Sequence, residues 1–198
     1  MPTIPPAATA GRWRRPEPAT ETGPGAGRGA AGYRGAVREL QQLRSDHAPR
    51  VLAFELANRA YFATSISDRG DAYFAQFPER FRALLSEQET GRAAYYVLLD
   101  EDGSVIGRFN LRDIDDGAAE VGYRVAERAT GRGVATAAVE ELCRLAVSRH
   151  GLRTLRARTT HENVASQRVL AKAGFAPTGA ADVGGRAGSW HVRVLHRS

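Results

Sequence analysis

The 198-residue sequence has one cysteine, one lysine and no long hydrophobic run. Because Cys143 stands alone, the chain can form no intrachain disulfide and no zinc site built from several cysteines. No apolar stretch approaches the ~20 residues that span a bilayer, and the N-terminus lacks the apolar core of a signal peptide. We therefore expect a cytoplasmic protein with no membrane partner and no metal site.

The net charge of +6 comes almost entirely from arginine, since Lys172 is the only lysine among 28 basic residues. Residues 1–35 contain five arginines and two glutamates, so half of the excess lies in this segment. A basic chain can bind nucleic acid, but no recognition-helix motif and no RNA-binding aromatic motif accompanies the charge. Nucleic acid is therefore not the expected partner.

Residues 1–35 also differ from the rest in composition, with six of the nine prolines and seven of the 21 glycines. Their apolar residues show almost no period, so the segment has too little surface to bury to offset the entropy of ordering. We expect a disordered leader rich in proline, glycine and arginine, with a docking arm for a partner as the alternative. Residues 36–198 form the expected single domain.

Apolar periodicity and turn residues divide the domain into strands and helices. Turn signals at 100–103 and 115–117 separate three consecutive strands, which indicates antiparallel hairpins. The expected strands are 37–43, 95–99, 105–111, 119–125, 154–160, 175–178 and 190–195. The expected helices are 51–57 with Asp46 or His47 near its N-cap, 68–89 with a break allowed at Pro78, 133–149 and 164–173. This order predicts an α/β (α+β) fold with a mixed sheet.

The segment from Arg128 to Thr136 closes a strand and opens an amphipathic helix. Gly131 and Gly133 let the backbone approach a ligand closely, because glycine has no Cβ to clash. The first N–H groups of a helix lack intrahelical partners and carry its partial positive charge, so they attract anions. The junction is therefore a candidate pyrophosphate site.

Three motifs in a fixed order resemble the acyl-CoA site of the GNAT superfamily of N-acetyltransferases. They are Arg128-x-x-Gly131-x-Gly133-Val134-Ala135-Thr136, Asn163-Val164-Ala165-Ser166 and Gly174-Phe175. The resemblance extends from Leu40 to Val194. It implies the GNAT fold, with a mixed, mostly antiparallel sheet of about seven strands, four flanking helices, and an acyl-CoA cleft where the fourth and fifth strands splay apart.

A dinucleotide-binding Rossmann unit is the competing interpretation, because Gly131-x-Gly133-x-x-Thr136 approximates its fingerprint. That unit needs an acidic residue about 20 positions further on to hold a ribose, and none occurs between Glu141 and Glu162. The hairpins before the motif also differ from the alternation of strand and helix in a Rossmann half. The GNAT fold is therefore favoured.

The resemblance implies that acetyl-CoA binds at the glycine junction as acyl donor. Backbone N–H groups of the junction would hold the pyrophosphate, and its arginines would add positive charge. The preceding strand end would pair with the pantetheine, and Asn163 would bind the same arm, a role compatible with an N-cap. The expected cofactor-binding residues are Tyr123, Arg124, Val125, Arg128, Ala129, Thr130, Gly131, Arg132, Gly133, Val134, Ala135, Thr136 and Asn163.

Acetyl transfer to an amine needs a group that removes a proton and one that protonates the departing thiolate. We expect Glu120 to be the base, directly or through water, with a solvent-facing strand residue as the alternative. By the resemblance, Ser166 is the candidate acid or hydrogen-bond donor to the thiolate. Many family members instead use a tyrosine at the position of Leu170, and that role is excluded here. The reserve candidates for the base are Glu55, Asp113, His161 and Glu162.

The segment from Glu55 to Phe62 resembles the acceptor-site wall of bacterial RimJ/RimL-type ribosomal-protein N-terminal acetyltransferases, which acetylate a protein α-amine. Ala63-Thr64-Ser65 replaces a Pro-Trp pair that often follows in that group. We expect Glu55 and Asn58 to bind the acceptor, and the acceptor to be a protein N-terminus. A small amine such as an antibiotic or polyamine, a non-catalytic acyl-CoA-binding module, and assembly as a homodimer remain open.

Overall fold

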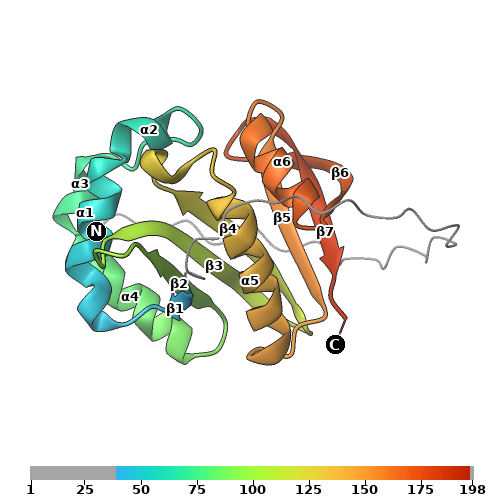
Figure 1. Cartoon of the computed structure of the whole chain (residues 1–198), viewed down its shortest axis with the longest axis horizontal. Coiled ribbons are helices and arrows are strands. Elements are labelled where there is room, and N and C mark those ends of the chain that lie inside the picture. The colour runs from blue at the N-terminus through green and yellow to red at the C-terminus, as the bar shows by residue number, and fades with distance from the viewer. Residues whose placement is uncertain (1–38, 197–198) are drawn as a thin grey trace, which may run out of the picture. The chain divides into compact units, whose positions relative to one another are not determined.

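A seven-stranded mixed sheet forms the centre of the computed structural model, which describes residues 39–196 (Figure 1). Hydrogen-bonded neighbours follow the order β1-β2-β3-β4-β5-β7-β6. The strands are β1 (Leu40–Gln42), β2 (Ala94–Leu99), β3 (Val105–Asp115), β4 (Ala118–Val125), β5 (Thr154–Thr160), β6 (Ala176–Asp182) and β7 (Ala187–Val194). Every neighbouring pair is antiparallel except β4 and β5, which confirms the expected sheet. The predicted leader, 1–35, lies outside the described residues.

Tight turns connect β2, β3 and β4 at the two expected places. The N–H of Gly103 donates to the carbonyl oxygen of Asp100 at 2.9 Å. Asp116 and Gly117 have φ values of 41° and 73°, and a type I′ hairpin turn requires positive φ at both central residues. β3 runs on to Asp115 instead of ending at Leu111, because an irregularity in register lets its pairing with β4 resume at the turn.

The C-terminal strands are also longer than their sequences predict. β7 lies between β5 and β6 and is hydrogen-bonded to both. This pairing keeps its residues in an extended strand although few of them are apolar. Gly188 permits this close packing, since a Cβ at that position would clash with the carbonyl oxygen of Thr159. Sheet context therefore outweighs local composition here.

Six α-helices occur within residues 39–196, where the resemblance implied four, so that number was wrong. They are α1 (Ala48–Ala57), α2 (Arg59–Ala63), α3 (Asp71–Ala75), α4 (Phe77–Glu89), α5 (Val134–Ser148) and α6 (Val164–Lys172). Short 3-10 turns occupy Ser45–His47 and Glu127–Ala129. The expected helix 68–89 divides at Gln76 and not at Pro78, which lies in the first turn of α4, where its missing N–H removes no helical bond.

Helices cover both faces of the sheet (Figure 1), with α5 and α6 on one face and α1 and α4 on the other. Buried residues of α5 recur at helical spacing, so one stripe of this helix faces the core. They are Val134, Ala138, Val139, Leu142, Cys143, Leu145 and Ala146. Full burial of a side chain such as Leu142 stabilises the fold by roughly 2 kcal/mol. Within the described part of the chain, no helix has the length and apolar character needed to cross a membrane.

β4 and β5 separate soon after they begin to pair. Their register contains Ala118↔Thr154, Ala119↔Leu155 and Glu120↔Arg156, and β4 then continues to Val125 without β5 beside it. β5 stays paired with β7 over its whole length. The expected splay of the fourth and fifth strands is therefore confirmed, and it begins directly after Glu120.

Candidate active site

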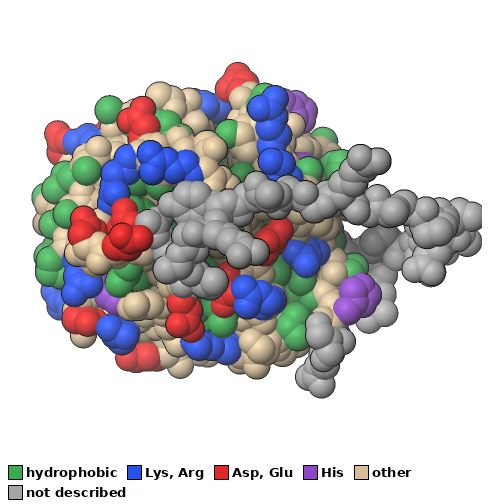
Figure 2. Space-filling view, in the orientation of Figure 1, with side chains coloured by type: hydrophobic (Ala, Val, Ile, Leu, Met, Phe, Trp, Pro, Cys, Tyr) green, Lys and Arg blue, Asp and Glu red, His purple; other side chains and the backbone are tan. Residues whose placement is uncertain are grey.

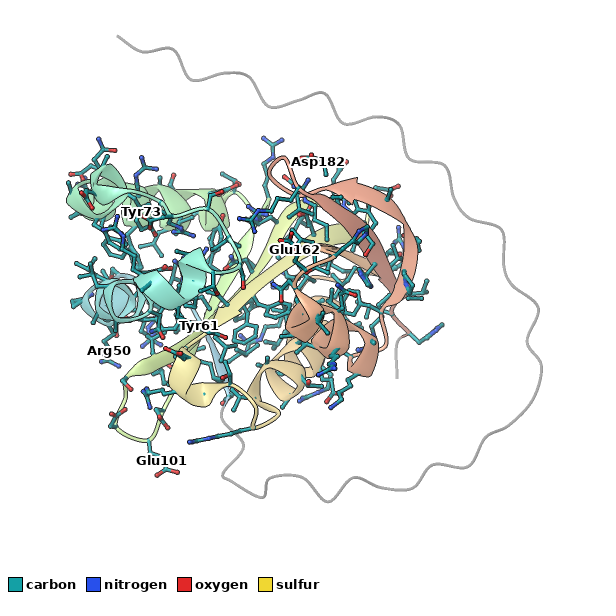
Figure 3. The ribbon with its side chains drawn as sticks, turned by 90° about the horizontal axis from the view of Figure 1, so that it is seen from above. Arg50, Tyr61, Tyr73, Glu101, Glu162 and Asp182 are labelled. Carbon is teal, nitrogen blue, oxygen red and sulfur yellow. The ribbon has the colours of Figure 1, made fainter. Side chains whose placement is uncertain are left out.

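The separation of β4 and β5 brings several predicted residues to one end of the sheet. Seen from above (Figure 3), α1 to α4 lie on one side of it, with Tyr61, and α6, β6 and β7 lie on the other, with Glu162. The loop that leads from β4 into α5 lies at the same end (Figure 1). Groups distant in sequence therefore meet here.

The start of α5 has the geometry expected of an anion-binding turn. Gly133 is the N-cap residue, with φ of 76° in the left-handed region, and Gly131 has φ of 73°. A Cβ built on either glycine would have no atom within 4 Å, so the space in front of the turn is open. The first helical hydrogen bond runs from the N–H of Ala137 to Gly133 O at 3.0 Å. The N–H groups of Val134, Ala135 and Thr136 thus precede the helical ladder and remain available to a ligand.

The two arginines of this turn have different surroundings. Arg128 donates from Nη1 to Asp100 Oδ2 at 2.6 Å and from Nη2 to Ser104 Oγ at 2.6 Å. Its guanidinium is therefore held by the turn between β2 and β3, a partnership that the sequence did not suggest. Arg132 lies exposed between the two glycines of the turn. Of the two, Arg132 is the side chain with greater freedom to reach a phosphate.

Ser166 and Asn163 lie together at the start of α6. The side chain of Asn163 accepts a hydrogen bond from Ser166 N at 3.0 Å, which confirms the N-cap role. Ser166 Oγ lies 3.0 Å from the hydroxyl oxygen of Tyr123 on β4, and the Tyr123 ring stacks on Phe109. Burial raises the pKa of Tyr123 to about 12, so its phenol keeps its proton at neutral pH.

The hydroxyl of Tyr123 is a functional group that the sequence analysis missed. Only the backbone of Tyr123 had been assigned a role, as part of the strand end. The contact joins residues 43 positions apart, on a strand and a helix, so no local spacing could indicate it. Together Tyr123 and Ser166 place two hydroxyl groups beside the separated strands.

Glu55 of α1 lies at the centre of a buried ion cluster. It accepts hydrogen bonds from Arg108 at 2.5 Å and Arg124 at 2.8 Å, and Arg69 lies 4.0 Å away. Its side chain is 1% exposed. Burial opposes ionisation, but Arg124, Arg108 and Arg69 outweigh it and hold the pKa of Glu55 below the ordinary value. Glu55 is therefore a poor proton acceptor, which weakens its candidacy as a general base.

Asn58 connects the acceptor-side helices to the loop before α5. Its Nδ2 donates to Phe54 O at 2.9 Å, and its Oδ1 accepts from Glu127 N at 3.0 Å. Both polar ends of the side chain are thus used within the protein. The structure indicates that Asn58 positions α1 against this loop, and direct binding of an acceptor by Asn58 stays a prediction.

Glu120 lies in the last residue pair before the strands separate. It is 5% exposed, so the alternative of a solvent-facing strand residue is wrong. Arg158 donates to it at 3.0 Å, and Arg112 lies 3.6 Å away. The carboxylate is therefore positioned beside the opening, and its charge is balanced by two arginines.

The arginines around both carboxylates were not identified from the sequence. Arg108, Asn110 and Arg112 alternate with apolar residues along β3, and such a period places them on one face of the strand. This alternation along β3 is visible in the sequence, but it does not indicate which residues of α1, β4 and β5 the arginines contact. Only the tertiary structure brings α1, β3, β4 and β5 together around Glu55 and Glu120.

We expect Glu55→Gln to lower the free energy of unfolding at neutral pH by about 3 kcal/mol, because three arginines lose their shared counter-ion. Since the folded-state pKa of Glu55 is below the unfolded value, its contribution is complete above the ordinary pKa of 4.5 and is lost as pH falls through the folded-state pKa. The gap between the two proteins should therefore close in acid, as measured by urea unfolding at several pH values.

The matched control is Glu79→Gln, which removes a carboxylate paired with Arg82 on the exposed side of α4. We expect it to change the free energy of unfolding by less than about 1 kcal/mol. A difference between Glu55→Gln and the unsubstituted protein that stays constant with pH would contradict the assigned role of the ionised carboxylate.

Comparison with solved structures identifies similar folds among acetyltransferases. Ribosomal-protein-S5-alanine acetyltransferase from Vibrio fischeri superposes with a TM-score of 0.75 at 20% identity, covering 83% of this chain and 97% of the other. Mycobacterium smegmatis RimJ, in complex with CoA-disulfide, gives a TM-score of 0.70 at 24% identity, covering 78% and 80%. Spermidine N-acetyltransferase from Vibrio cholerae, in complex with CoA and spermine, gives 0.68 at 15% identity, covering 81% and 97%.

A search of curated protein sequences found no match. Residues 38–176, in contrast, match the family model described as an acetyltransferase (GNAT) domain. This range contains β4 with Glu120, the glycine turn and α6 with Ser166. The chain therefore belongs to the GNAT family and is an acetyl-CoA-dependent acetyltransferase.

Proposed function

We propose that the chain transfers the acetyl group of acetyl-CoA to the α-amine of a protein N-terminus. The observation that carries this choice is the excess of arginine beside the strand opening, where Arg69, Arg108 and Arg124 surround the single carboxylate of Glu55. A polyamine carries several positive charges and would be repelled by such a wall. A peptide has one reacting α-amine, and the rest of the peptide, which contacts these arginines, can have any charge.

The chemistry of an α-amine also suits these residues. An α-amino group has an ordinary pKa near 8, whereas that of a lysine side chain is about 10.4, so far more of the α-amine is uncharged at neutral pH. Glu120 shares its charge with two arginines, and Glu55 is held ionised by three. An α-amine that is partly uncharged at neutral pH needs little help from a side chain to lose its proton.

The donor site is proposed at the turn before α5. Backbone N–H groups of Gly131 to Thr136 would hold the pyrophosphate, with Arg132 adding charge, and the unpaired edge of β4 beyond Glu120 would hold the pantetheine arm. Bound there, acetyl-CoA supplies the activated acetyl thioester. The open space in front of both glycines supports the fit.

The remaining roles fall to residues around the opening. Glu120 accepts the proton of the amine, directly or through water, at the point where β4 and β5 part. Ser166, hydrogen-bonded to the protonated phenol of Tyr123, holds a proton for the sulfur. Asn163 fixes Ser166 by capping α6.

We expect Gly133→Trp to abolish detectable binding of CoA in calorimetry, because the indole occupies the open space in front of the N–H groups. Gly133→Ala is the matched control, since it shares the strain of a positive φ without the bulk. The alanine variant should keep measurable affinity and lose roughly 1–2 kcal/mol of stability. Equal affinity in the tryptophan variant and the unsubstituted protein would place the pyrophosphate elsewhere.

We expect Ser166→Ala and Tyr123→Phe each to lower kcat by about tenfold, with little change in the KM for acetyl-CoA. This is less than a usual general acid contributes, because a thiolate leaves readily without a proton. Tyr123→Phe keeps the ring that stacks on Phe109 and removes only the hydroxyl. Ser86→Ala, on the exposed side of α4, is the control. Unchanged kcat in both hydroxyl variants would remove the pair from the reaction.

The acceptor is tested by release of free CoA thiol with peptides and amines under one set of conditions. A peptide with a free N-terminus should be acetylated at that amine, as located by mass spectrometry, and the same peptide with a blocked N-terminus and an internal lysine should not. The kcat/KM for spermidine should be lower by at least about tenfold, because its positive charges are repelled by the arginines beside the strand opening. Faster turnover of spermidine than of every free peptide would refute the proposed acceptor.

A further inference from the structure

One face of the sheet beside the opening carries an unusual charge arrangement. The register pairs Arg108 with Arg124, Asn110 with Gly122, and Arg112 with Glu120. Side chains of directly opposed residues in neighbouring strands project to the same face, and alternate residues share that face along each strand. All six positions therefore face the side of α1, which also supplies Glu55.

Two ion clusters occupy this face. In the first, Arg69, Arg108 and Arg124 surround Glu55, and in the second, Arg112 and Arg158 flank Glu120. Each carboxylate can balance one guanidinium charge. Both clusters therefore keep an excess of positive charge among the described residues.

Both carboxylates and Arg108 are buried, whereas the other four arginines of the clusters are partly accessible. Glu55 is 1% exposed, whereas Arg124 is 19% and Arg69 is 33% exposed. The side chain of Glu120 is 6% exposed, whereas the side chain of Arg158 is 41% exposed. A ligand that approaches this face thus meets guanidinium groups before the carboxylates of Glu55 and Glu120, and the one other carboxylate that lines the pocket beside Arg69 and Arg124, Asp68, is paired with Arg59.

The floor between the clusters is open. Gly122 lies between Glu120 and Arg124 on β4, and a Cβ built there would approach only Asn110 Nδ2, at 4.0 Å. Two buried polar atoms nearby have no hydrogen-bond partner within the described residues, Asn110 Oδ1 and Arg156 Nε. Buried polar groups normally have partners, so these atoms indicate a place where a polar ligand completes the hydrogen bonding.

This excess of positive charge is local. On the face of the domain drawn in Figure 2, blue and red side chains are interspersed, as is usual for a globular surface. Arg82 of α4 and Arg59 of α2 follow that usual pattern, since Arg82 pairs with Glu79 and Arg59 pairs with Asp68 and Asp71. The two clusters depart from it, because each buried carboxylate is shared among several arginines.

We propose that the accepted protein N-terminus is acidic, with an aspartate or glutamate in its first few residues whose carboxylate binds Arg69 and Arg124. This inference rests on the proposed function, and it adds the chemical class of the acceptor. Arginine favours such a ligand because its planar guanidinium makes paired hydrogen bonds with a carboxylate. The incoming charge also supplies the counter-ion that Glu55 cannot supply to three arginines at once.

The geometry of the strand sets the position of the acidic residue. Gly122 and Arg124 are two residues apart, which corresponds to roughly 7 Å at about 3.3 Å per residue. An extended peptide advances by a similar distance per residue. An amine above Gly122, next to Glu120, therefore brings the second or third side chain of the peptide to Arg124 and Arg69.

The test compares three peptides that differ only at positions two and three, which are both acidic, both glutamine or both lysine. The measured quantity is kcat/KM from CoA thiol release, with the N-terminal residue and the length held constant. We expect the acidic peptide to exceed the glutamine peptide by about tenfold, the effect of one charge-assisted contact. The preference should fall as salt is raised, because exposed charges are screened.

Arg69→Gln is the informative variant, because Arg69 is exposed and its ion pair with Glu55 is long, at 4.0 Å, while its guanidinium lies over the Tyr73 ring at 4.3 Å. It should reduce the acidic-to-glutamine ratio from about tenfold to about threefold or less, and Arg69→Glu should shift the preference toward the lysine peptide. Arg82→Gln removes the same charge from the surface of α4 and should leave the ratio unchanged. Melting temperatures of all variants exclude general unfolding as the cause.

Two failures can be told apart. If free peptides are acetylated but the acidic, glutamine and lysine peptides react equally, or the lysine peptide reacts fastest, the acidic preference is wrong and the N-terminal acceptor stands. If no peptide is acetylated while a small amine is, the proposed acceptor class itself is wrong, and the inference falls with it.

Discussion

The early separation of β4 and β5 is the constraint on which the candidate site depends. Three residue pairs join the strands, and then β5 follows β7 while β4 follows β3. Because β4 stays paired with β3 and β5 stays paired with β7, the sheet can open while each of the two strands keeps one hydrogen-bonded edge. The opening leaves one edge of β4 without a strand partner between Glu120 and the loop that leads into α5. Glu120 lies at the point where the two strands part.

The charges around the opening follow from the same architecture. Glu55 and Glu120 are buried on the face of the sheet that α1 covers, and an isolated buried carboxylate would be very costly. Arginine suits this task because its guanidinium stays charged and can hydrogen-bond in several directions at once. Since several arginines share each carboxylate, the clusters stabilise the interior and still present positive charge to a ligand. The same arginine side chains thus stabilise the buried carboxylates and provide the positive charge that a ligand meets.

Much of the fold could be predicted from the sequence, because its turns and helix starts have local causes. Gly103, Gly117 and Gly133 all have the positive φ that their turns require, and each lies at the boundary between two elements as expected. The elements that were predicted poorly are those whose stability comes from their neighbours. β7 extends to Ala187 because two strands pair with it, and α2 forms in a segment whose helical pattern is too short to be recognised alone.

The sequence alone determined the order of strands and helices, the glycine turn before α5, the capping of α6 by Asn163, and hence the family. These features depend on residues within a few positions of one another, where backbone sterics and local hydrogen bonds decide the outcome. Only the tertiary structure decided that Tyr123 reaches Ser166, and that arginines from the loop before α3 and from β3 and β4 surround Glu55. Such contacts depend on sheet register and helix packing, which bring together side chains that no sequence spacing relates.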